Sequence, residues 1–190
     1  LHVQLQTPTE GWVSSLVHEK SSFSILDIKE DGEYVRLLVE LKGFLPQEFQ
    51  NSFTKVEKDV YLGTLRVKSK IGSILAKYTV IQGFELEGSL LWALVLEGYQ
   101  ELRRLLREFV DNKIDVKVLK VVKARSKSVI TARQEQIIRI ALEAGYYDYP
   151  RKITLKKLAE KLNISLATLD EILRRAEKNI IESYLREKGL

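Results

Sequence analysis

The sequence contains no cysteine, no methionine and only two histidines, and it has no long apolar run. Without cysteine it cannot form disulfides, thiolate metal sites or a cysteine nucleophile, and His2 and His18 cannot make a histidine metal cluster on their own. The longest apolar stretch, GSLLWALVLEGY, is far shorter than the ~20 residues of a membrane-spanning helix, and nothing resembles a signal peptide. We therefore expect no metal site, no cofactor, no membrane partner and a cytoplasmic location.

The sequence also lacks the motifs of common enzymes. It has no glycine-rich phosphate loop with Gly-Lys-Ser/Thr, no nucleophile elbow and no His-Glu-x-x-His pair. Its many carboxylates show no spacing typical of an acid/base pair, so they are better explained as solvated surface. We therefore expect that the protein is not an enzyme.

What the sequence does contain is typical of a folded protein with two domains. It has 190 residues, 45% of them apolar and 30% charged, close to the globular average. Residues 1–123 hold 17 Lys and Arg against 17 Asp and Glu, whereas residues 124–190 hold 14 against 9. A small basic module beside a neutral one is typical of a domain that binds phosphates. The alternative is a solvated, heat-adapted charged surface.

Residues 1–123 have the pattern of an α+β domain. Strands are predicted at 23–29, 33–41, 60–68, 73–81, 90–96 and 114–122, the first two joined by a turn at Asp31-Gly32. Helices are predicted at 46–58, where Phe49 and Phe53 share a stripe, and at 99–112. Two successive β-α-β units favour a ferredoxin-like (ACT-like) sandwich, a layout that many small sensor domains share. We expect a sensor or assembly domain here.

Residues 124–190 are predicted to be helical throughout. Thr131, followed three residues later by Gln134, is a capping box that begins a helix, and Gly145 is placed to end it. Its buried face is expected to consist of Ile137, Ile138, Ala141 and Leu142. The rings of the three tyrosines in GYYDYPR are expected to cover the junction with the next helix.

The most specific pattern lies in ITLKKLAEKLNISLATLDEILRRAEK. A short amphipathic helix at 155–162 ends at Asn163, a residue that suits a tight turn, and Ser165 can cap a second helix that runs to about Lys188. Ala159 must be small because the second helix crosses closely there. This is the spacing of a helix-turn-helix, in which the second helix lies in a DNA groove.

Several short motifs agree in order with a known family over residues 128–181. They are Arg133-Gln134, Gly145-Tyr146, Pro150-Arg151, Leu158-Ala159 and Leu173-Arg174-Arg175-Ala176-Glu177. The stretch closely resembles the C-terminal helix-turn-helix of archaeal regulators of the bacterio-opsin activator type. The resemblance implies a transcription regulator whose N-terminal part varies and can sense a signal. The sequence departs from that pattern at Leu166 and Ala167, where family members often carry small polar residues.

Candidate DNA contacts follow from this spacing. We expect base contacts at the start of the second helix, from Ser165, Leu166, Ala167, Thr168, Asp170, Glu171 and Arg174. The two acids can accept from a cytosine amino group but would be repelled by a phosphate. We expect backbone contacts from Arg151, Lys152, Lys156, Lys157 and Arg133, with Arg125 and Lys127 as further candidates.

The second half of the last helix is longer than a helix-turn-helix needs. It carries an apolar stripe formed by Ile180, Ile181, Tyr184 and Leu185. We expect this stripe to pack on a partner subunit or on the first domain. A homodimer would place two recognition helices about one DNA turn (~34 Å) apart on a palindromic site.

The function predicted from the sequence is therefore transcription regulation by a DNA-binding protein. Double-stranded DNA is the expected partner, and an unidentified small-molecule effector is a possible second one. The alternative is a non-enzymatic adaptor whose helical domain docks to transcription machinery, a use that Asp170 and Glu171 would suit.

Overall fold

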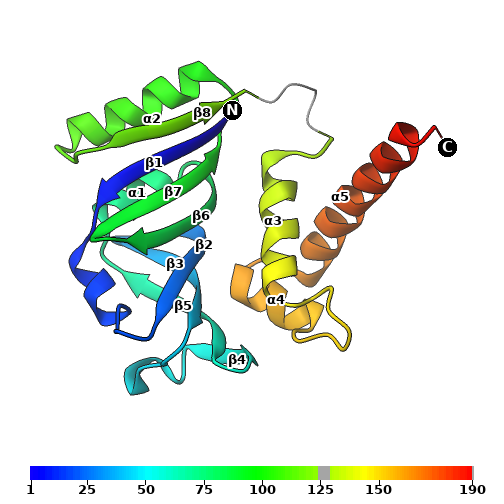
Figure 1. Cartoon of the computed structure of the whole chain (residues 1–190), viewed down its shortest axis with the longest axis horizontal. Coiled ribbons are helices and arrows are strands. Elements are labelled where there is room, and N and C mark those ends of the chain that lie inside the picture. Colours follow the sequence, from blue (N-terminus) through cyan, green and yellow to red (C-terminus); the bar gives the residue numbers. More distant parts are fainter. Residues whose placement is uncertain (124–128, 190) are drawn as a thin grey trace. The chain divides into compact units, whose positions relative to one another are not determined.

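The computed structural model describes residues 1–123 and 129–189 (Figure 1). The chain divides into two compact units, Leu1–Lys123 and Ala124–Leu190. The first unit is built on a sheet, and the described part of the second is helical, so the α+β class predicted from the sequence is confirmed. Arg125 and Lys127, the further candidates for contacts with the DNA backbone, lie outside the described residues. None of the helices in the described ranges combines the length and apolarity that crossing a bilayer requires.

The first unit contains one eight-stranded sheet. Its strands are β1 (His2–Pro8), β2 (Ser22–Asp31), β3 (Tyr34–Lys42), β4 (Phe53–Glu57), β5 (Val60–Val67), β6 (Thr79–Leu86), β7 (Ser89–Val95) and β8 (Lys117–Val122). They lie in the order β4-β5-β3-β2-β6-β7-β1-β8, and each pair is antiparallel. The helices are η1 (Gly11–Ser15), η2 (Gln47–Phe49), α1 (Lys70–Leu75) and α2 (Tyr99–Asp111). Side chains of α1 and α2 join those of the strands in one apolar core.

The predicted hairpin at the start of the domain is confirmed. β2 and β3 pair over nearly their whole length, and Gly32 in the turn has a φ of +63°, a conformation that glycine adopts without a Cβ clash. The other predicted elements that hold are the strand at 60–68, the apolar run at 90–96, the helix at 99–112 and the strand at 114–122. The long-range pairing of β1 with β7 and β8 was not predicted from the sequence.

The helix predicted at 46–58 is wrong. The chain makes one 3-10 turn at η2 and then continues as the strand β4, whose Phe53 pairs with Gly63 of β5. A Cβ placed on Gly63 would lie 2.3 Å from the Phe53 ring. The ring therefore occupies the space that a side chain at position 63 would take. Phe49 and Phe53 still contact each other, with ring centroids 6.1 Å apart, but Phe49 belongs to η2 and Phe53 to β4, so they do not share one helix.

The strand predicted at 73–81 is only partly correct, because its first half belongs to α1. Ser69 caps that helix by accepting a hydrogen bond from the amide of Gly72, and β6 begins only at Thr79. The ferredoxin-like (ACT-like) layout is not confirmed. One β-α-β unit is present, β7-α2-β8, with β1 inserted between its strands, and the other is replaced by antiparallel neighbours.

The second unit contains α3 (Ala132–Glu143), α4 (Leu155–Leu162) and α5 (Leu166–Glu187). The capping box is confirmed: the Thr131 hydroxyl accepts from the Gln134 amide at 3.2 Å, and the Gln134 side chain accepts from the Thr131 amide at 2.9 Å. Gly145 has a φ of +73° and follows the end of α3. The predicted inner face of α3 needs one correction, because Leu142 is exposed and Ile140 is buried in its place.

Candidate nucleic-acid interface

The turn between α4 and α5 is set by local hydrogen bonds. Asn163 takes a left-handed conformation with φ +53°, and the amide of Ile164 then donates to the carbonyl of Ala159 at 3.1 Å. Ser165 follows in an extended conformation, and its hydroxyl accepts from the amide of Thr168 at 3.0 Å. Thr154 caps α4 in the same way by accepting from Lys157. The tight turn predicted at Asn163 and the cap at Ser165 are therefore confirmed.

Small and branched apolar side chains fill the space between the helices of this unit. Leu158, Leu162 and Leu169 are at most 1% exposed, Leu173 is 2% exposed, and Ala159 is 3% exposed. The methyl side chain of Ala159 permits α5 to pass close to α4. Because this packing takes up the inner side of α5, the opposite side of its first turns faces outward.

The outward side of α5 carries the residues that the sequence predicts to contact bases. Ser165, Leu166, Ala167, Thr168, Glu171 and Arg174 are exposed, and Asp170 is half-buried. The hydroxyls of Ser165 and Thr168 lie 2.7 Å apart, so both participate in the helix cap. The structure thus brings these seven residues to the cap and the first three turns of one helix.

The acids on this face are paired with arginines of the same helix. Asp170 Oδ2 lies 2.9 Å from Nε of Arg174, and Glu171 Oε1 lies 2.7 Å from Nη2 of Arg175. Arg175 was missed by the sequence prediction, although its position four residues after Glu171 is the spacing of a helical ion pair. The two carboxylates are therefore compensated locally, and the face is not acidic as a whole.

The predicted backbone contacts lie around the start of α4. Lys156 and Lys157 are exposed in its first turn, which contains no acidic residue. Positive side chains at a helix N-terminus add to the positive end of the helix dipole, an arrangement that suits a phosphate. Lys161, one turn further on, has a lowered pKa because it is partly buried and because Lys157 is close.

The other predicted backbone contacts are held by neighbours. The guanidinium of Arg151 lies 4.5 Å from the centre of the Tyr146 ring, and Lys152 lies 2.8 Å from the carboxylate of Asp148. Arg133, on the first turn of α3, donates to the side chain of Gln136. Specific partners thus hold each of these three cations. Arg133 lies on α3, whereas Arg151 and Lys152 lie in the loop before α4.

The loop before α4 is fixed to α5 by one tyrosine. The Tyr147 hydroxyl donates to Oε1 of Glu177, and its pKa is raised by burial and by this carboxylate. The Tyr146 ring packs edge-on against Tyr147, with centroids 5.0 Å apart. Tyr149 is fully exposed, so the prediction that all three rings cover the helix junction is wrong for this residue.

The second half of α5 has a different surface. Ile180, Ile181, Tyr184 and Leu185 are 39–58% exposed, although each is apolar or aromatic. We call these four residues the apolar stripe.

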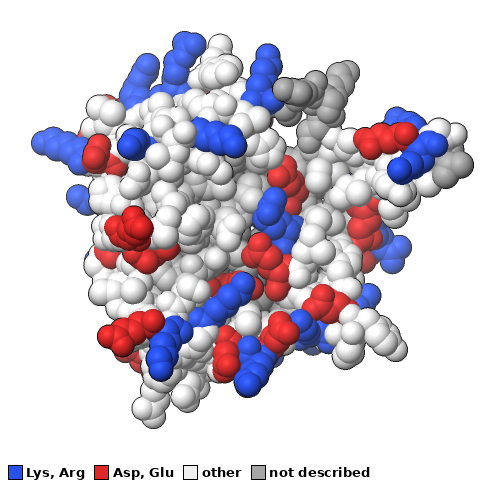
Figure 2. Space-filling view, in the orientation of Figure 1, with Lys and Arg blue, Asp and Glu red and all other residues white. Residues whose placement is uncertain are grey.

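In Figure 2, acidic and basic side chains are interspersed over the visible face and do not gather into a single basic field.

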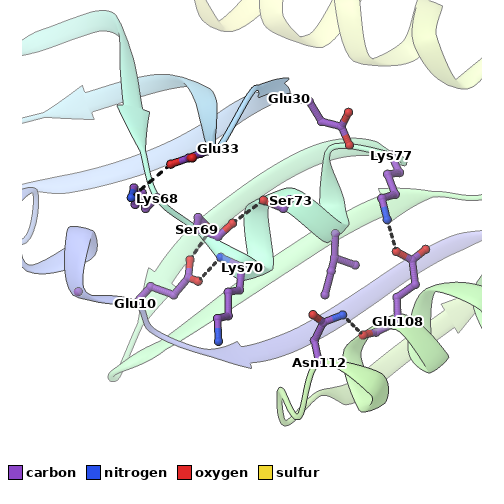
Figure 3. Close-up of a pocket in the computed structure, with 12 residues that line it drawn as sticks. Glu10, Glu30, Glu33, Lys68, Ser69, Lys70, Ser73, Lys77, Glu108 and Asn112 are labelled. Atoms are coloured by element: carbon purple, nitrogen blue, oxygen red, sulfur yellow. Dashed lines mark hydrogen bonds and ion pairs between the residues drawn. The ribbon is translucent and has the colours of Figure 1, made fainter.

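The first unit has a polar cavity of about 740 Å³ that the sequence did not predict (Figure 3). Glu10 lines it and accepts from the amides of Lys70 and Ile71 at 2.8 and 3.2 Å. Across the cavity, Glu108 pairs with Lys77 at 2.5 Å and accepts from the Tyr78 hydroxyl at 2.7 Å. Burial raises the pKa of Glu108, but hydrogen bonds from Lys77 and Tyr78 outweigh it, so the pKa is lowered. A cavity with charges of both signs can hold a small polar molecule.

Comparison with known proteins finds one family model that matches the helical unit. Residues 130–182 match the family described as HTH DNA binding domain, which confirms the resemblance predicted over residues 128–181. A Haloferax volcanii protein provisionally described as a transcriptional regulator is 42% identical over 60 residues, or 32% of this chain and 10% of that protein. Transcriptional regulator NarO of the same organism is 32% identical over 56 residues, or 30% of this chain and 26% of NarO. The chain thus aligns with about a tenth and about a quarter of these relatives.

Proposed function

We propose, from the premise that residues 130–182 are a helix-turn-helix DNA-binding domain, that the protein regulates transcription by occupying promoter DNA. The observation that carries the proposal is the outward face of α5, which is free of apolar core packing and belongs to a helix that packs against α4, whose first turn carries exposed lysines. In a helix-turn-helix, the second helix lies in the major groove and the first crosses the backbone. α5 and α4 would take these two places.

In this proposal, seven residues of α5 and its cap face the base edges, namely Ser165, Leu166, Ala167, Thr168, Asp170, Glu171 and Arg174. Arg151, Lys152, Lys156, Lys157 and Arg133 contact phosphates. Leu166 and Ala167 suit the methyl group of thymine, because apolar contact with that methyl is one way in which the major groove is read.

The test is the salt dependence of binding to duplex DNA. Affinity through phosphates falls with a slope of about −0.9 per contact in a plot of log K against log salt. Lys156→Ala should weaken binding to all sequences alike and reduce the slope by about 1. Lys188→Ala, on the far end of α5, is the matched control and should leave both unchanged. Affinity that does not respond to salt would contradict the proposal.

We also propose that the apolar stripe pairs with a second copy of the chain. Support comes from its exposure and from the length of α5, whose 22 residues span ~33 Å, well beyond a recognition helix. Light scattering tests this. Ile181→Glu should convert a dimer to a monomer, whereas Arg186→Glu, on the other side of the helix, should not. A wild-type chain that is monomeric at micromolar concentration would remove the dimer from the proposal.

The first unit would then act as the sensor or assembly part. The polar cavity between Glu10, Lys70 and Glu108 supports this, because it is large enough for a small polar effector. Ser73→Trp, which fills the cavity from α1, should abolish the response of a promoter reporter to growth conditions and leave operator affinity in vitro unchanged. A reporter that still responds would exclude this cavity as the sensor.

The adaptor alternative gains no specific support. It requires Asp170 and Glu171 as an acidic docking surface, but both are compensated by Arg174 and Arg175. An adaptor would also show neither salt-dependent DNA binding nor a base preference, so the salt experiment distinguishes the two functions.

A further inference from the structure

The outward face of α5 carries two parallel stripes of similar composition. One consists of Ala167, Asp170 and Arg174, and the other of Thr168, Glu171 and Arg175. In each, an acid is followed four residues later by an arginine, so the two charged groups meet on one side of the helix. Both arginines remain exposed. The stripes differ in the atoms that make the ion pair.

In the first stripe, the ion pair uses the inner nitrogen of the guanidinium. Arg174 approaches Asp170 through Nε, whereas Arg175 approaches Glu171 through the outer nitrogen Nη2. The two outer nitrogens of an arginine are the pair that can bind O6 and N7 of guanine end-on. A carboxylate at Nε therefore lies on the side edge of the guanidinium plane and leaves the outer edge, which carries one N–H of each outer nitrogen, free to bind a base. A carboxylate at Nη2 occupies part of the fork instead.

The direction of the pair along the helix also suits base recognition. Because Asp170 precedes Arg174 by four residues, the ion pair draws the guanidinium about one turn (~5.4 Å) towards the N-terminus of α5. That end of a recognition helix contacts the base edges. Ala167 lies next on the same stripe, and its methyl group is too short to block the path. An exposed ion pair contributes little to stability, so the fold does not require this geometry.

We propose that Arg174 binds a guanine of the operator and that Asp170 is a positioning residue that aims the guanidinium at this base. The inference rests on the proposed DNA-binding function. The carboxylate of Asp170 has a cost, since a negative charge close to phosphates weakens binding to every duplex. Asp170 therefore lowers overall affinity while it raises selectivity, a combination that a structural residue does not produce.

The experiment begins with selection of bound duplexes from a random pool by the full chain. Binding is then measured for the selected site and for the same site with each guanine replaced by adenine or by 7-deazaguanine, which lacks N7. At one guanine, the wild-type chain should lose about 5- to 150-fold in affinity on replacement by adenine. Arg174→Lys should lose most of this discrimination, because an ammonium cannot bind O6 and N7 as a planar fork.

Asp170→Asn is the decisive variant, and Glu182→Gln is its matched control, because Glu182 forms an exposed ion pair with Lys178 in the second half of the same helix. Both remove one negative charge from α5, so neither should bind duplexes of unselected sequence more weakly than the wild type. Only Asp170→Asn should reduce discrimination at the guanine to the level of Arg174→Lys. Circular dichroism of all three variants should match the wild type, because the ion pairs are exposed.

The outcomes distinguish failure of the proposal for Arg174 and Asp170 from failure of the proposed DNA-binding function. If the chain selects a site but no guanine depends on Arg174, the inference is overturned and the DNA-binding function stands. The same holds if Asp170→Asn and Glu182→Gln discriminate alike. If the wild-type chain selects no site and its binding does not respond to salt, the proposed function fails and the inference fails with it.

Discussion

The two halves of α5 present different surfaces on one continuous helix. In the first half, Leu169 and Leu173 are buried against α4, and the outward side carries small residues and compensated charges. In the second half, Ile181 and Tyr184 are more than half exposed. A surface of small residues and paired charges tolerates water and admits a polar partner, whereas exposed isoleucine and tyrosine favour an apolar one. The difference supports the two tasks that we propose for this helix, DNA contact at its start and chain pairing at its end.

The largest expected effect comes from truncating the inner side of the first half. Leu169→Ala should lower the free energy of unfolding of the helical unit by ~2–5 kcal/mol, because Leu169 is 0% exposed and its loss leaves a cavity. Ile181→Ala should change it by less than ~0.5 kcal/mol in the monomer. Urea denaturation followed by circular dichroism, at a concentration where light scattering finds monomers, measures both. Similar losses would mean that both halves belong to the core.

Overpacking the crossing point should give the next largest effect. Ala159→Leu adds three carbons where α5 passes α4 and should cost ~1–3 kcal/mol of unfolding free energy. Ala167→Leu makes the same chemical change on the outward side of α5 and should be nearly neutral. Thermal denaturation of the two variants compares them directly. A neutral Ala159→Leu would show that the helices do not cross closely at this residue.

The backbone of the turn gives a third test. Asn163 has a φ of +53°, a conformation that costs a β-branched residue ~1–2 kcal/mol, so Asn163→Val should destabilise the unit by about that amount. Asn163→Gly should not, because glycine adopts positive φ freely. The pair is measured in the same urea series. Equal stability of the valine and glycine variants would contradict a left-handed turn here.

The smallest expected effect concerns the cap at the start of α5. Ser165→Ala removes the acceptor for the Thr168 amide and should cost ~1 kcal/mol. Ser183 lies inside the second half of the same helix, where alanine has a higher helix propensity than serine. Ser183→Ala should therefore not destabilise the helix. If the two alanine variants behave alike in thermal denaturation, the cap does not stabilise α5.

The helical unit could be predicted from the sequence because short-range chemistry determines it. Thr131 with Gln134, Asn163 and Ser165 each act on residues within four positions, and all of them behave as predicted. The prediction missed Arg175, although the spacing from Glu171 was visible. It also misplaced Leu142, because an amphipathic stripe alone does not show which of its edges is covered.

The sheet was harder to predict because its partners are distant in the sequence. β1 pairs with β7 and β8, more than 80 residues away, and nothing local in HVQLQTP shows this. Phe53 lies on a helical stripe with Phe49, yet the space above Gly63 of β5 fixes it in a strand. The cavity around Glu10 and Glu108 brings together four elements, so individual carboxylates resembled solvated surface.

The most direct test of the central claim is hydroxyl-radical footprinting of side chains with and without duplex DNA. Leu166 and Leu185 are the same residue type at opposite ends of α5 and are 49% and 39% exposed. If the start of the helix enters the groove, oxidation of Leu166 should fall when the selected duplex is added, while oxidation of Leu185 should stay unchanged. Unchanged oxidation of Leu166, or protection of Leu185 alone, would contradict the account.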